Sequence, residues 1–125
     1  MQYVYFNIVK KYQYLVKLVP MKTRSVFEFD SYKKLMANRL SSEGSRGQLS
    51  RAAEALNCQP SFLSRVIKAE IHLTPDHAFL LSEFWRLAGD EAEYFQLLVD
   101  TERASNPKYR SALRAKAALM REKHE

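Results

Sequence analysis

The sequence predicts an all-α fold, a compact bundle of five to six helices, and three observations support that prediction. Only three glycines and four prolines interrupt the 125 residues, which favours long regular elements. From residue 26 onward, apolar residues recur at intervals of three and four, the period of an amphipathic helix. Capping residues followed by proline or acidic residues mark helix starts along the same stretch. With 46% apolar residues the chain can bury one hydrophobic core, but it is too short for two ordinary domains of roughly 100–150 residues each.

An apolar, basic arm is expected at residues 1–25. β-branched and aromatic residues dominate positions 3–19, which favours a strand, although a helical spacing of apolar residues is also present. A strand of this kind would pair with a second copy of itself in a dimer. The apolar run is much shorter than the ~20 residues that cross a membrane, and it lacks the features of a signal peptide. Met21 is an alternative start of the chain, which would make the residues before it an upstream extension.

The next domain, residues 26–105, is expected to open with two helices. Asp30 or Ser31 can cap the first of them. The apolar positions of this helix follow the 3.6-residue period and would face the core: Tyr32, Leu35, Met36 and Leu40. The polar, glycine-containing residues 41–45 then mark a stop. A second helix is expected over about 48–56, with the following side chains on its inner face: Leu49, Ala52, Ala53 and Leu56.

Three further helices are expected in the same domain. One opens at Pro60 or Ser61 and runs to about residue 69. Thr74-Pro75-Asp76 combines a hydroxyl cap, a proline at the first helical position and an acidic first turn, so a helix should start there and end near Gly89. Another begins at Asp90-Glu91.

A last helix is expected at residues 106–125, because Asn106-Pro107 repeats the cap-plus-proline signature. The sequence spacing predicts one side made of Tyr109, Ala112, Leu113, Ala117 and Met120. The opposite side would carry three arginines: Arg110, Arg114 and Arg121.

The stretch 49–69 fits the spacing of a helix-turn-helix. Its fifth position, Ala53, is small, as a close crossing of two helices requires. Its ninth position, Asn57, is a residue that tolerates positive φ in a turn. Cys58 then supplies a small residue suited to a buried position. Two more apolar residues, three positions apart, would hold the second helix against the first: Leu63 and Val66.

The run over 51–69 resembles the helix-turn-helix of phage-repressor-like regulators, of the Cro and lambda repressor type. The helix-turn-helix of these regulators commonly has the sequence Leu-Gly-Val-Ser-Pro, followed by Leu-Ser-Arg-Ile. At the same positions this chain has Leu56-Asn57-Cys58-Gln59-Pro60 and Leu63-Ser64-Arg65-Val66. Roughly residues 27–120 also resemble a bacterial family of proposed transcriptional regulators with a second helical domain. Three features depart from the pattern: Asn57 and Ala69 replace the usual glycines, and the chain stops where the second domain would begin.

The resemblance implies a sequence-specific DNA-binding transcriptional regulator whose recognition helix, about residues 60–69, enters the major groove of double-stranded DNA. Three residues would face base edges: Gln59, Ser61 and Phe62. Arg65 would read a guanine or hold a phosphate. The start of the preceding helix would clamp the DNA backbone with Arg46, Gln48, Ser50 and Arg51. Three lysines are weaker candidates for phosphate contacts: Lys33, Lys34 and Lys68.

Each of these residues also has a purely structural interpretation. Phe62 could belong to the core, Arg65 and Lys68 could be solvated surface charges, and Gln59, Ser61 and Ser50 could serve only the helix starts.

No catalytic constellation is recognisable, and we expect neither enzymatic activity nor a cofactor or metal. His72 and His77 do not share a helical face, and no carboxylate accompanies them in a zinc-binding pattern. The single cysteine, Cys58, excludes a disulfide framework and a thiolate metal cluster, which favours a reducing, cytoplasmic setting. Four acidic residues could attract a cation but fit a solvated surface better: Glu83, Asp90, Glu91 and Glu93.

The net charge of +6 is unevenly distributed, and two hypotheses for function follow. Residues 75–105 carry seven acidic and two basic residues, whereas the flanking segments are basic. The favoured hypothesis is a homodimer on a palindromic site with half-sites ~34 Å apart, with no effector identified. Its contact would involve either the arm at 3–19 or the last helix, through Tyr109, Leu113 and Met120. The alternative is a helical protein-interaction module in which the acidic block selects a basic partner and three aromatic residues form the docking surface or, more simply, the core: Trp85, Tyr94 and Phe95.

Overall fold

The computed structural model describes residues 23–125, and every regular element in that range is helical. A short 3₁₀ turn, η1, comes first, and the α-helix that follows it runs directly into a π-helical turn, η2. The elements in chain order are η1 (Val26–Glu28), α2 (Tyr32–Met36), η2 (Ala37–Ser41), α3 (Gln48–Leu56), α4 (Pro60–Ile67), α5 (Pro75–Phe84), α6 (Asp90–Arg103) and α7 (Pro107–Lys123). The predicted all-α bundle of five to six helices is confirmed, with six α-helices within residues 23–125, while the predicted arm lies outside the described residues except at 23–25.

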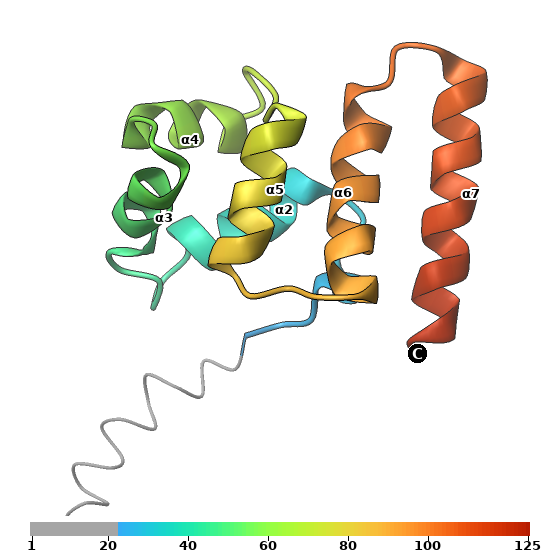
Figure 1. Ribbon diagram of the computed structural model, residues 1–125, viewed down its shortest axis with the longest axis horizontal. Helices are drawn as coiled ribbons and strands as arrows, with labels where there is room; N and C mark the ends of the chain where they lie inside the picture. The colour runs from blue at the N-terminus through green and yellow to red at the C-terminus, as the bar shows by residue number, and fades with distance from the viewer. Residues whose placement is uncertain (1–22) are drawn as a thin grey trace, which may run out of the picture.

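The bundle has two ends joined through its middle (Figure 1). α3 and α4 form one end, and α6 and α7 lie side by side, antiparallel, at the other. α5 stands between them and packs against both α3 and α6, while α2 contacts both α4 and α6. α2 and α5 therefore connect the two ends of the bundle.

Three of the predicted helix starts are confirmed by their caps. The Ser31 hydroxyl accepts a hydrogen bond from the backbone N–H of Lys33, so Ser31 rather than Asp30 caps α2. Thr74 caps α5 in the same way, and Asn106 caps α7. Each side chain satisfies a backbone donor that has no partner inside the helix.

The predicted end of α5 near Gly89 is wrong. The helix ends at Phe84, because Arg86 adopts a left-handed conformation with φ of 58°. The N–H of Leu87 then bonds back to the carbonyl of Ser82 at 2.9 Å, which closes the helix in a Schellman motif. A partly buried Leu87 packs against the core beyond this turn and helps to fix the early stop.

The core confirms the apolar positions that the 3.6-residue period predicts. Fully buried side chains come from every helix between α2 and α6, and they include Leu35, Ala52, Leu63, Val66 and Leu81. Tyr94 and Phe95 are also fully buried, and the ring of Trp85 packs edge-on against Phe95 with centroids 5.4 Å apart. These three aromatic residues therefore belong to the core and do not form a docking surface.

The predicted division of α7 into an apolar and an arginine side is only partly correct. Leu113 and Ala117 are buried and Met120 packs against the core, but Tyr109 and Ala112 are exposed. Two of the arginines bond within the bundle instead of facing solvent: Arg110 donates to the Ala104 carbonyl, and Arg121 donates to the Tyr94 hydroxyl. Because Leu113 and Met120 pack on their own chain, only Tyr109 of the predicted dimer contact in this helix remains free.

Tyr32 connects the first helix to the segment that follows α4. Its buried hydroxyl accepts a hydrogen bond from the Leu73 N–H at 3.1 Å and lies 2.8 Å from Nδ1 of His72. Since the hydroxyl accepts from Leu73, its own proton is directed to His72, which then accepts it in the neutral form. Burial raises the pKa of Tyr32 to about 12 and lowers the pKa of His72. Both directions favour this uncharged pair.

Two side chains of α6 extend the same network. Glu102 accepts a hydrogen bond from the Tyr32 N–H at 3.0 Å, and Arg103 donates to the Leu73 carbonyl at 2.7 Å. The start of α2 and the loop after α4 are thus bonded to the end of α6. The loop has no regular secondary structure of its own, so these bonds satisfy its backbone.

We predict that Tyr32→Phe lowers the free energy of unfolding by about 1–3 kcal/mol, because it leaves the buried Leu73 N–H without an acceptor. Urea denaturation measures the change. Tyr109→Phe is the matched control, since Tyr109 is 54% exposed, and its stability should equal that of the parent chain. Equal stability of the two variants would contradict the role given to the Tyr32 hydroxyl.

Candidate nucleic-acid interface

The turn between α3 and α4 has the geometry that the sequence predicts. Asn57 is left-handed, with φ of 54° and ψ of 50°. The N–H of Cys58 bonds to the Ala53 carbonyl at 2.9 Å, so α3 ends in a Schellman motif. Ala53 is buried, as its predicted position at the helix crossing requires, while Cys58 is only half-buried. Three residues, 57–59, separate the two helices.

α4 is held in place by its apolar side. Leu63 and Val66 have no exposed surface, which confirms their predicted role. Pro60 occupies the first turn, where its missing N–H costs no hydrogen bond. The helix ends at Ile67, and Ala69 beyond it is left-handed with φ of 67°. The N–H of Glu70 bonds to the Arg65 carbonyl at 3.0 Å and completes this second Schellman motif.

The opposite side of α4 and its flanks present polar side chains to solvent. Four of the predicted DNA-contacting residues are exposed there: Gln59, Ser61, Arg65 and Lys68. Gln59 occupies the N-cap position but makes no side-chain capping bond, so its amide is not used by the helix start. Because these side chains are exposed to solvent, a base or a phosphate could reach them.

Phe62 is different from its neighbours in the predicted site. Its half-buried ring packs against the core, and its centroid lies 5.1 Å from that of His77 in α5. The contact joins α4 to the start of α5. Only the remaining exposed edge of the ring could touch a thymine methyl group, and the packing role is the one that the structure displays.

Arg65 has one ionic partner within the chain. Its Nε lies 3.2 Å from a carboxylate oxygen of Glu70, and both side chains are more than half exposed. An exposed pair of this kind stabilises a fold by only about 0–1 kcal/mol, so a stronger anion can displace it. Sequence reasoning did not identify Glu70 as a partner, because the left-handed turn at Ala69 brings it back toward α4.

The start of α3 has unused backbone donors. Its N-cap is Gly47, with φ of 82°, and no side chain caps the helix. The Gln48 N–H bonds to the Ser45 carbonyl, but within residues 23–125 no acceptor is present for the N–H groups of Leu49 and Ser50. Uncapped amides at a helix start bind anions. The missing cap was visible in the sequence, since a glycine precedes Gln48 where a serine, threonine, aspartate or asparagine would cap the helix.

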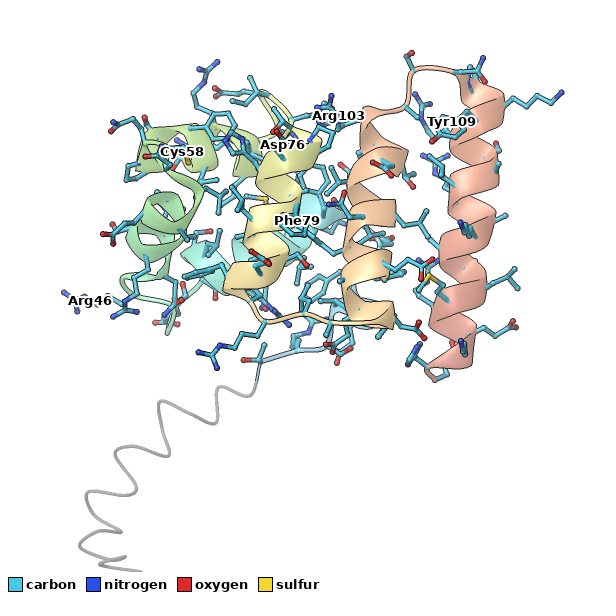
Figure 2. All side chains as sticks on the ribbon, viewed as in Figure 1. Arg46, Cys58, Asp76, Phe79, Arg103 and Tyr109 are labelled. Carbon is cyan, nitrogen blue, oxygen red and sulfur yellow. The ribbon has the colours of Figure 1, made fainter. Side chains whose placement is uncertain are left out.

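Two arginines flank these amides. Arg46 is exposed in the preceding turn, and its side chain extends away from the bundle (Figure 2). The guanidinium of Arg51 lies over Gly47, since a methyl group built on that glycine would stand 3.7 Å from one terminal nitrogen. The predicted clamp residues Arg46, Gln48, Ser50 and Arg51 therefore surround one end of one helix, and all but the half-buried Gln48 are exposed.

The two lysines of α2 are not part of this surface. Lys33 donates to the Ile71 carbonyl at 2.6 Å, and Lys34 pairs with Asp30 at 3.4 Å. The Lys33 ammonium group is thus hydrogen-bonded to the loop after α4, which argues against its predicted contact with a phosphate.

The described part of the chain lacks the side-chain clusters that bind metal ions. No cluster of three or more histidine, cysteine, aspartate or glutamate side chains could hold a metal ion there. Burial raises the pKa of the Cys58 thiol, the direction that disfavours a nucleophilic thiolate. None of the helices within residues 23–125 is long and apolar enough to cross a membrane.

Comparison with known proteins gave no match: no protein family, no curated protein and no solved structure matches this chain.

We predict that Ala69→Gly raises the free energy of unfolding by about 0.5–1 kcal/mol, because glycine adopts the left-handed conformation without a Cβ clash. The gain is measured by urea denaturation. Ala115→Gly, at an exposed position in the middle of α7, is the control and should destabilise by about 1 kcal/mol. A loss of stability at both positions would show that the conformation of residue 69 is not strained.

Proposed function

We propose that this protein is a sequence-specific DNA-binding transcriptional regulator in which α4 lies in the major groove. The observation that carries the proposal is the α3–α4 pair itself. A three-residue turn that begins with the left-handed Asn57 joins two helices that pack through buried apolar residues, while the outer side of α4 and the uncapped start of α3 remain open. These are the parts by which helix-turn-helix proteins read bases and hold phosphates.

The size of the α3–α4 pair suits a groove. α3 has nine residues, so about 14 Å separates its start from its end, at 1.5 Å per residue. The major groove is about 12 Å wide. A phosphate at the start of α3 and bases near the start of α4 can therefore be contacted together.

The residues would then divide into two roles. Gln59 would pair with an adenine, Ser61 with either base type, and Arg65 with a guanine after leaving Glu70. Arg46, Arg51 and the free amides of Leu49 and Ser50 would hold a phosphate, with Gln48 and Lys68 as further backbone contacts. Phe62 would fix the angle of α4 through His77.

A homodimer on a palindromic site is part of the proposal, with half-sites ~34 Å apart. An exposed apolar side chain on α5 supports a dimer contact there. Phe79 in α5 is 55% exposed, and it is the exposed large apolar side chain nearest to the α3–α4 end among residues 23–125 (Figure 2).

The deciding experiment selects bound sequences from a random pool of duplex DNA, at low salt and at near-physiological salt. An enriched palindrome that persists at the higher salt is the expected result. Unselective binding that disappears with salt would leave only a basic protein with affinity for polyanions. Absence of binding at both salt concentrations would reject the proposal in favour of a helical protein-interaction module.

We predict that Arg65→Ala weakens binding to the selected site by about 1–3 kcal/mol and relaxes the preference at one base position, because a bidentate contact to guanine is lost. Fluorescence anisotropy with the selected duplex and with single-base variants measures both effects. Unchanged affinity would reject Arg65 as a base contact.

We predict that Arg46→Ala and Arg51→Ala weaken binding to all sequences equally and each reduce the salt slope by about 1, because each removes a phosphate contact. Titrations of the selected duplex and of a scrambled duplex at several salt concentrations measure the slope. Lys116→Ala is the matched control, since this exposed lysine of α7 lies at the opposite end of the bundle (Figure 1). A change in base preference in either arginine variant would contradict the assignment to phosphates.

A further inference from the structure

A cleft separates the start of α2 from the α6–α7 pair, on a part of the surface that the α3–α4 interface does not use. It consists of two hollows of about 830 and 500 Å³ that share three lining residues, Asp30, Lys34 and Arg121, and therefore adjoin. The larger hollow is wide open to solvent and the smaller one is half enclosed, and the smaller volume falls in the range of sites that take small molecules, about 300–1,000 Å³. The cleft draws its walls from elements far apart in sequence.

Two of the three acidic side chains of this cleft form ion pairs within the chain. Glu28 pairs with Arg24 at 2.9 Å, and Asp30 pairs with Lys34 at 3.4 Å. Glu102 accepts a hydrogen bond from the neutral Tyr32 N–H, which leaves its negative charge in place. No carboxylate in the described part of the chain forms an ion pair with Arg114 or Arg121. These two guanidinium groups of the cleft thus exceed its one unpaired carboxylate, which leaves an excess of positive charge.

Arg121 is fixed in the wall of the cleft by a buried hydroxyl. One of its terminal nitrogens donates to the Tyr94 hydroxyl at 2.8 Å, and that hydroxyl donates in turn to the Phe29 carbonyl at 2.6 Å. Tyr94 has no exposed surface, so the arrangement is held on the protein side. A guanidinium has five N–H donors, and the bond to Tyr94 occupies one of them. The remaining donors can bind a carboxylate or phosphate in two-pronged fashion.

Arg114 stands two turns earlier on α7, and apolar side chains lie beside both arginines. Ala117 lies between them in sequence, and Leu98 and Phe29 line the two hollows. All three of these side chains are almost fully buried, so most of the apolar contact in the cleft comes from half-buried Ala37 and from the aliphatic stems of Lys34 and the arginines. A ligand that satisfies this lining needs an acidic group for the arginines and an apolar body for the wall.

We propose that this cleft binds a small organic anion, a carboxylate or phosphate group attached to an apolar body, with Arg114 and Arg121 holding the acidic group.

Hydrogen bonds connect this cleft to the loop that follows α4. Asp30 and Lys34 of the cleft bracket Tyr32 and Lys33, which bond to the loop that follows α4. A ligand that shifts the start of α2 would move that loop. Regulation of DNA affinity by the ligand rests on the proposed function, whereas occupancy of the cleft does not.

The test titrates the ¹⁵N-labelled chain with octanoate and follows the backbone amide signals. The expected result is a saturable shift at residues that line the cleft, such as Leu98, Thr101 and Ala117. Two control ligands should each bind at least about tenfold more weakly than octanoate. Octanol has the same chain length and no charge, and inorganic phosphate has charge and no apolar body. Equal binding of octanol would overturn the role of the arginines, and equal binding of inorganic phosphate would overturn the apolar part of the proposal.

The variant that tests the site is Arg114→Gln, which removes an exposed charge with no hydrogen bond within residues 23–125 and should leave the fold intact. Octanoate binding should weaken about tenfold. Lys108→Gln, an equal loss of charge outside the cleft on the same helix, should leave binding unchanged. No saturable shift in the parent chain, or equal affinity in the two variants, would overturn the proposal. Because the readout is the amide spectrum without DNA, this result is independent of whether the chain binds DNA.

Discussion

The Tyr32 hydroxyl is the contact on which the arrangement of the two ends depends. The loop after α4 has no regular hydrogen bonding of its own, and its Leu73 N–H and C=O bond to Tyr32 and to Arg103. Tyr32 in turn is held by Glu102 through its backbone N–H. One buried residue, through its hydroxyl and its backbone N–H, therefore joins the first helix, the exit of α4 and the end of α6. Because an unpaired buried donor costs more than a made bond gains, the network favours a single relative position of these three segments.

Residues in the left-handed conformation determine where the helices stop. α3, α4 and α5 each end in the same motif, at Asn57, Ala69 and Arg86, and none of the three is a glycine. The left-handed conformation costs alanine and arginine about 1–2 kcal/mol each, and asparagine less. The buried side chains that follow, such as Leu73 after α4, offset this cost. Packing, rather than local preference, thus sets the length of α4 and the direction in which the chain leaves it.

The sequence predicted what depends on period and on caps, and it missed what depends on long-range hydrogen bonds. The six helices, the caps at Ser31, Thr74 and Asn106, and the turn at Asn57 follow from local chemistry. The early end of α5 did not, because a glycine is the usual signal and the chain uses Arg86. The positions of Lys33 and Arg121 were not predictable either, since their acceptors lie 38 and 27 residues away along the chain. The same holds for the candidate interface: the exposed residues of α4 were predictable, but the contact of Phe62 with His77 depends on how α5 packs.

Charge distribution keeps a polyanion away from α5 and α6. All seven acidic residues of segment 75–105 lie in these two helices, whereas Arg46, Arg51, Arg65 and Lys68 belong to α3, α4 and their flanking turns. Residues 106–125 are basic as well, with six basic and two acidic residues, so charge alone does not choose between α7 and the α3–α4 end, and the open helix start and exposed polar side chains of α3 and α4 must supply the choice. The cleft beside α7 differs from the α3–α4 end in how its charges are arranged. Glu28 and Asp30 are paired there, and Arg114 and Arg121 outnumber the one unpaired carboxylate, Glu102. A small anion needs only such a local excess of guanidinium groups, whereas a duplex needs donors spread over a pair of helices, so the two proposed sites call for different ligands.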